Sequence, residues 1–87
     1  MQPPLSNFDA LEMATVAVKI AEQRSDPKEF FERWPDISKK ERKDITELWF
    51  QMSYYENDRV HSPDSAEWYR LSALDYAARI RERITAS

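Results

Sequence analysis

The chain has 87 residues and a net charge of −3, and it contains no glycine, no cysteine and a single histidine. This length suits one domain of residues 1–87, and no segment approaches the ~20 apolar residues of a membrane span. The composition excludes glycine-dependent sites such as P-loops, dinucleotide fingerprints and EF-hand loops, and it excludes zinc sites built from Cys and His.

Polar capping residues and five prolines divide the chain into four helices. Ser6 or Asn7 can accept a hydrogen bond from the first turn of a helix, which predicts a first helix over residues 8–24. Residues 1–6 precede this helix and are expected to form a flexible N-terminal tail.

A second, short helix is predicted over residues 27–34. Asp26 suits the N-cap and Pro27 suits the first helical position, where its missing N–H costs nothing. Glu29 can reach back as the partner of a capping box. Pro35 disfavours the helical conformation at the residue before it, so the helix is expected to end there.

The third helix is predicted over residues 39–57. Ser38 and Glu41 have the spacing of another capping box. Asn57 is the best candidate in this segment for a left-handed residue at the end of the helix.

A fourth helix is predicted over residues 63–84, with Ser62 as its cap and Pro63 at its first position. No segment alternates apolar and polar residues in the manner of a strand. The sequence therefore predicts an all-α fold, a compact bundle of four helices whose second helix is short.

The third helix has apolar residues on two faces. At 100° per residue, one arc forms a core face that contains Ile45, Leu48, Trp49, Met52 and Tyr55. Phe50 and Tyr54 lie roughly opposite this arc and are neighbours on the helix surface, because they are four residues apart.

The fourth helix shows the same surplus. One stripe contains Ala66, Tyr69, Ala73, Tyr76, Ala77, Ile80 and Ile84. A second stripe, about 150° away, contains Leu71 and Leu74, and Trp68 belongs to neither stripe. Two interpretations remain open: the bundle buries two faces of some helices, or part of the surplus stays exposed to bind a partner.

Exposed aromatic anchors predict a non-enzymatic regulator, inhibitor or adaptor that acts through a protein–protein interface in the cytoplasm. The partner is another protein or a second copy of the chain as a homodimer, and no membrane, metal or cofactor is expected. Charged residues at the rim are expected to orient the partner. The predicted partner-binding residues are Phe50, Tyr54, Trp68, Leu71, Leu74, Lys43, Glu47 and Arg70.

A nucleic-acid-associated protein is the alternative. Its phosphate contacts would come from a basic cluster at the start of the third helix, formed by Lys39, Lys40, Arg42 and Lys43. Acidic residues interleave with this cluster, and a solvated charged face also explains it. A complex held by phosphate contacts should weaken steeply as salt rises, whereas an apolar protein complex should change little.

No catalytic residues are predicted. His61 falls in an expected loop between residues 57 and 62, near Asp58 and Ser62. Neighbouring side chains in one loop seldom reach the geometry of a nucleophile, a base and an orienting group, so an enzyme is not expected.

Overall fold

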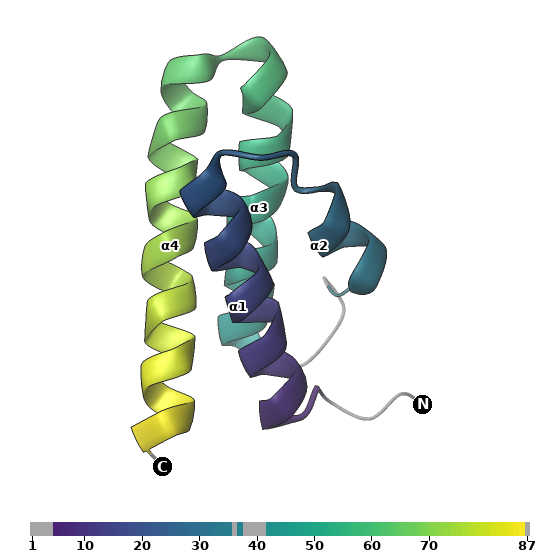
Figure 1. Ribbon diagram of the computed structural model, residues 1–87, viewed down its shortest axis with the longest axis vertical. Helices are drawn as coiled ribbons and strands as arrows, with labels where there is room; N and C mark the ends of the chain where they lie inside the picture. Colours follow the sequence, from purple (N-terminus) through teal and green to yellow (C-terminus); the bar gives the residue numbers. More distant parts are fainter. Residues whose placement is uncertain (1–4, 36, 38–41, 87) are drawn as a thin grey trace.

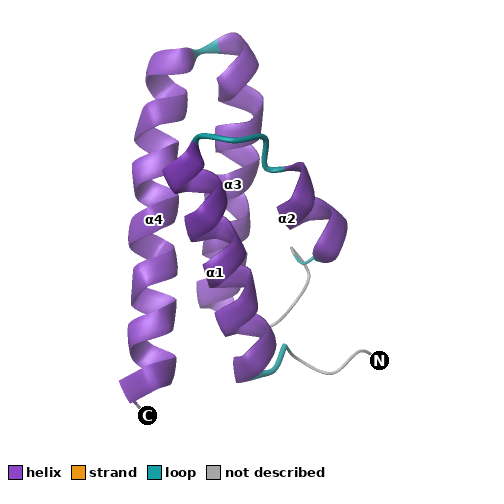
Figure 2. Cartoon of the chain, in the orientation of Figure 1, coloured by secondary structure: helices purple, strands orange, loops and turns teal. Residues whose placement is uncertain are grey.

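The computed structural model describes residues 5–35, 37 and 42–86, and this part of the chain is helical with short connections (Figures 1 and 2). Its described residues form no strand, which confirms the predicted all-α class. The helices are α1 (Asn7–Gln23), α2 (Lys28–Arg33), α3 (Lys43–His61) and α4 (Pro63–Ala86).

The two long helices α3 and α4 form an antiparallel hairpin, and α1 lies against it, antiparallel to α4 (Figure 1). The short α2 lies beside α1, on the side away from α4 (Figure 1). The arrangement is thus a three-helix bundle with one short helix added, and no helix of the described residues covers one broad face of the α3–α4 hairpin.

The start of α1 follows the predicted cap. The Ser6 hydroxyl oxygen accepts a hydrogen bond from the Asp9 N–H at 3.0 Å. Leu5 packs against the core. Of the predicted tail, Leu5 and Ser6 therefore belong to the folded body, and residues 1–4 lie outside the described residues.

At the end of α1, Arg24 adopts the left-handed backbone conformation that glycine usually adopts. Arg24 has φ 51° and ψ 33°, and its N–H bonds to the Ala21 carbonyl while the Ser25 N–H bonds to the Ile20 carbonyl. These two bonds form a Schellman motif, in which glycine is the usual left-handed residue. A residue with a Cβ pays about 1–2 kcal/mol there, so the structure tolerates local strain at Arg24.

The bounds of α2 lie within one residue of the prediction. The Asp26 carboxylate accepts a hydrogen bond from the Lys28 N–H at 3.0 Å, and Pro27 is the N-cap residue. Trp34 precedes Pro35 and adopts φ −130° and ψ 69°, which ends the helix as expected.

The predicted end of α3 at Asn57 is wrong, because the helix continues to His61. The stop comes from Pro63, which keeps Ser62 out of the helical conformation at φ −148° and ψ 78°. Since Ser62 alone joins α3 to α4, no left-handed residue is needed (Figure 2). The predicted start at residue 39 is also wrong, because Arg42 is extended, at φ −86° and ψ 103°, and the helix begins at Lys43. The predicted caps Ser38 and Glu41 lie outside the described residues.

The core is formed by side chains from all four helices and Ile37. The predicted core face of α3 is confirmed at Ile45, Leu48, Met52 and Tyr55, whereas Trp49 is half-buried. The predicted stripe of α4 is likewise buried or packed against the core. None of the described helices combines the length and the apolar character that crossing a membrane requires.

Candidate functional site

Four aromatic side chains from α3 and α4 make a continuous row on the uncovered side of the hairpin. The rings of Phe50 and Tyr54 stack at 6.3 Å, Tyr54 meets Tyr69 at 5.0 Å, and Tyr69 meets Trp68 edge-on at 4.9 Å. We call these four residues the aromatic face. Its distances are typical of favourable ring pairs, so the row is an ordered surface.

Three of the four residues of the aromatic face are partly exposed to solvent. Phe50 is 40% exposed, Tyr54 is 47% exposed and Trp68 is 64% exposed. Tyr69 is half-buried and packs against the core at the same time. The fold therefore fixes Tyr69 from below, and Tyr69 in turn holds Tyr54 and Trp68 in place.

The hairpin explains why these residues meet. Tyr54 lies eight residues before Ser62 and Tyr69 lies seven residues after it, so the antiparallel helices bring the two rings to the same level. Phe50 and Tyr54 point away from the buried side of α3 because they lie opposite Leu48 and Met52 on the helix.

Tyr69 is the residue of the aromatic face that the sequence analysis assigned only to the core. In the sequence, Tyr69 and Tyr54 are nearly equally far from Ser62, and this equal separation predicts that their rings meet. The prediction requires a connection of Ser62 alone, whereas the sequence predicted a loop from residue 57 to residue 62.

The two leucines predicted beside the aromatic anchors differ in exposure. Leu71 is 53% exposed and lies one turn after Trp68 on α4, so it extends the apolar surface along that helix. Leu74 is half-buried.

A second group of aromatic residues lies between α2 and α3 and is part of the fold. The Trp49 ring meets Phe31 edge-on at 4.7 Å and lies 5.6 Å from Phe30, which is fully buried. Trp34 packs against the same Phe30 at 5.8 Å. Thus α2 covers Trp49, whereas no described helix covers Phe50.

Two ion pairs tie α2 to α1. Arg33 bonds to Glu12, and Lys19 approaches Glu29 at 3.9 Å. Glu29, predicted to complete a capping box, is placed by this contact with α1. The short helix is therefore anchored on both its apolar and its polar side.

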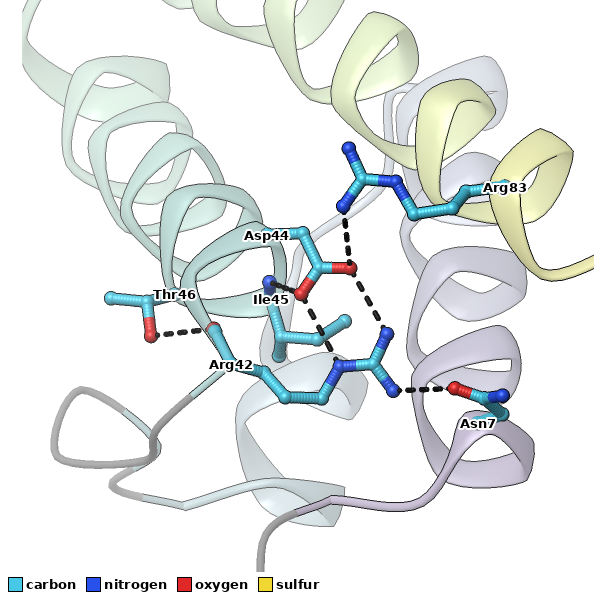
Figure 3. A network of polar contacts seen from close by, with 6 residues as sticks. All are labelled: Asn7, Arg42, Asp44, Ile45, Thr46 and Arg83. Carbon is cyan, nitrogen blue, oxygen red and sulfur yellow. Dashed lines mark hydrogen bonds and ion pairs between the residues drawn. The ribbon is translucent and has the colours of Figure 1, made fainter.

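The predicted basic cluster is only partly within the described residues, since Lys39 and Lys40 lie outside them. The Arg42 guanidinium forms two bonds to the Asp44 carboxylate, at 3.3 and 3.0 Å, and a third to the Asn7 side chain at 3.0 Å (Figure 3). Arg83 from α4 reaches the same carboxylate at 3.8 Å (Figure 3). Arg42 thus joins the starts of α1 and α3, and Asp44 links this pair to Arg83 of α4. This internal role of Arg42 competes with phosphate binding.

This network lowers the pKa of the Asp44 carboxyl. Burial acts to raise its pKa, but the hydrogen bond and charge of Arg42, the Ile45 N–H and the charge of Arg83 together hold the pKa below its ordinary value. Asp44 is therefore ionised at neutral pH and neutralises part of the basic cluster from within.

Arg70 was predicted at the exposed rim, and the structure buries it, leaving 8% exposed. Its guanidinium donates to the Ala21 carbonyl at 3.2 Å and to the Glu67 carboxylate, where the Nε bond is 2.9 Å. Arg24 donates to the same carboxylate at 3.2 Å. The physical reason is the end of α1: the Ala21 carbonyl, which already accepts the Arg24 N–H, faces α4 and accepts a second hydrogen bond from Arg70.

The two arginines lower the pKa of Glu67 to about 2, first through the hydrogen bond from Arg70 and then through the one from Arg24. This carboxylate therefore belongs to the joint between α1 and α4. It is separate from the aromatic face.

A groove between the start of α3 and the end of α4 contains the other two predicted rim residues, Lys43 and Glu47. Tyr76 and Arg79 line the same groove, and the Arg79 guanidinium lies 5.7 Å from the Tyr76 ring centre. Arg79 also pairs with Asp75 at 2.7 Å. Lys43 forms no ion pair with any other described residue, so its charge is available on this surface.

His61 is the exposed last residue of α3 and does not lie in a loop as expected. Within the described ranges, no three His, Cys, Asp or Glu side chains come together as metal ligands. In comparisons with known proteins, no family model, no curated protein and no solved structure matches this chain.

Proposed function

We propose that this chain is a non-enzymatic binding protein, a regulator, inhibitor or adaptor, that acts by presenting the aromatic face to another protein. The observation that carries the proposal is the Tyr54–Tyr69 contact of 5.0 Å, which joins the rings of α3 to the rings of α4 in one surface. Large exposed aromatic side chains in contact with one another are typical of interface hot spots.

The placement of the rings supports the same function. Tyr54 and Trp68 lie on the long helices α3 and α4, and each ring contacts Tyr69. A partner that covers the row would remove apolar area from water without ordering a loop. We also propose a cytoplasmic location, with which a chain lacking cysteine is compatible.

The nucleic-acid alternative receives less support from the geometry. Arg42 is engaged with Asp44 and Asn7, which leaves Lys43 as the exposed cation of the cluster among the described residues. One lysine gives a weak phosphate-binding surface. We therefore do not propose it as a second function.

The experiment is affinity capture of the full chain from its native host, followed by mass spectrometry. The variant Tyr54→Ser/Trp68→Ser removes two anchors, and Phe8→Ser/Val60→Ser is the matched control because Phe8 and Val60 are 74% and 77% exposed outside the aromatic face. We expect the anchor variant to lose about tenfold or more of a protein that wild type and control both retain. Equal capture by all three chains would contradict the proposal.

A further inference from the structure

We propose that the aromatic face pairs with a second copy of this chain, in an antiparallel arrangement about a two-fold axis level with Phe50 on α3 and Ser72 on α4. This inference rests on the proposed function, because it requires the aromatic face to be an interface. It goes further by naming the occupant and the register.

The charges at the two ends of the face give the first argument. Lys43 has no ion pair with another described residue, whereas Arg79 and Arg83 at the same end are paired with Asp75 and Asp44. At the other end, Asp58 and Asp64 flank the turn at Ser62, and within the described part of the chain neither is paired with a cation. The face thus carries an unpaired positive charge at one end and unpaired negative charges at the other.

The spacing of these charges gives the second argument. Lys43 lies seven residues before Phe50 and Asp58 lies eight residues after it. At the rise of an α-helix, these separations are about 10 and 12 Å along α3. A two-fold axis at Phe50 therefore places Lys43 of one copy next to Asp58 of the second copy, and the symmetry makes this contact twice.

The register on α4 is consistent with the same axis. Trp68 lies four residues before Ser72 and Tyr76 lies four residues after it. The two-fold axis thus brings the exposed Trp68 of one copy to Tyr76 of the second copy, which lines the groove beside Lys43. Contact between the Trp68 ring of one copy and the Tyr76 ring of the second copy is a favourable aromatic pair.

The parallel arrangement of two copies is disfavoured by charge. It would place α3 of one copy over α4 of the second copy at the same level. Lys43 would then face Arg79 of the second copy, because both residues line one groove, and Asp58 would face Asp64 across the turn. Like charges at both ends oppose that arrangement, so the charge pattern selects the antiparallel one.

The test is sedimentation equilibrium of the purified full chain and two charge variants. We expect wild type to form dimers, Lys43→Glu to weaken dimerisation about tenfold, and Lys43→Glu/Asp58→Lys to restore it by reversing the pair. Circular dichroism checks that both variants remain helical. This check is needed because Lys43 is exposed but Asp58 is half-buried.

A monomeric wild type at high micromolar concentration would overturn the inference, and so would a double variant that stays as weak as Lys43→Glu. These outcomes are separate from failure of the proposed function. If wild type is a monomer but Tyr54→Ser/Trp68→Ser still loses a captured foreign protein, only the second copy is excluded as occupant. If the anchor variant captures that protein as wild type does, the proposed function itself fails.

Discussion

At the scale of single residues, two arginines complete the end of α1, where glycine is the usual residue. Arg24 takes the left-handed position after α1, and Arg70 donates to the Ala21 carbonyl in the last turn of the same helix. Glu67 bonds to both arginines and so completes the joint between α1 and α4. The stability of this joint depends on the ionised form of Glu67.

The joint predicts a pH dependence of stability. The folded-state pKa of Glu67 lies at about 2, below its ordinary value of 4.5, so the carboxylate stabilises the fold above pH 4.5 and loses this effect as the pH falls toward 2. Glu67→Gln should therefore unfold at lower urea than wild type at pH 7, and the difference should shrink between pH 4.5 and pH 2. The measurement is urea unfolding at pH 7, 4.5, 3 and 2.

Glu82→Gln is the matched control, because Glu82 is an exposed carboxylate on the same helix. It should unfold like wild type throughout this range. A wild-type advantage over Glu67→Gln that is as large at pH 2 as at pH 7 would show that the carboxylate charge does not hold the joint.

At the scale of the elements, α3 places the adjacent aromatic residues Trp49 and Phe50 in different surroundings. Trp49 is covered by Phe30 and Phe31 of α2, whereas Phe50 lies on the uncovered side of the helix. The one-residue step rotates the side chain by about 100°, which is enough to change its surroundings from core to solvent.

This separation predicts unequal costs of substitution. Trp49→Ala should lower the free energy of unfolding by about 3 kcal/mol, since it removes a large ring packed against the core. Phe50→Ser/Tyr54→Ser should cost less than Trp49→Ala, because Phe50 is 40% exposed and Tyr54 is 47% exposed. Chemical denaturation of the two variants measures both values, and a larger loss in the double variant would reverse the assignment of the two faces.

The sequence predicted the four helices because proline and capping residues act locally. Ser6, Pro35 and Pro63 each fix a boundary through their own backbone neighbours, and the structure confirms these boundaries. The end of α3 was predicted too early, at Asn57. Asn57 and Pro63 are both typical of helix ends, but only Pro63 excludes the helical conformation sterically, at the residue before it. Periodicity also separated the core of α3 from Phe50 and Tyr54.

The candidate site was harder to predict because it depends on pairs of residues from different helices. The burial of Arg70 follows from the position of the α1 carboxyl end against α4, which no pattern within α4 contains. The contact of Tyr69 with Tyr54 follows from the one-residue turn at Ser62. The periodicity of one helix predicts which residues share a face of that helix. Which faces of different helices contact each other depends on the packing of the whole chain.

At the scale of the whole molecule, three helices and one short helix leave one side of a long hairpin uncovered. Figure 1 shows α1 against this hairpin and α2 beside α1. Phe31 of α2 covers Trp49, while Phe50, Tyr54 and Trp68 of the aromatic face stay exposed among the described residues. A second helical layer over this side would complete a bundle of two packed layers. We therefore propose that a protein surface covers the aromatic face.

The most direct test is photo-crosslinking in the native host, with a photoreactive phenylalanine analogue in place of Tyr54 and, as control, in place of Phe8. We expect the probe at position 54 to give a discrete crosslinked species heavier than the 10.4 kDa chain, and the probe at the exposed position 8 to give none. Mass spectrometry of that species identifies a second copy or a foreign protein. The absence of any adduct at position 54, or equal adducts at both positions, would contradict the claim that the aromatic face is an interface.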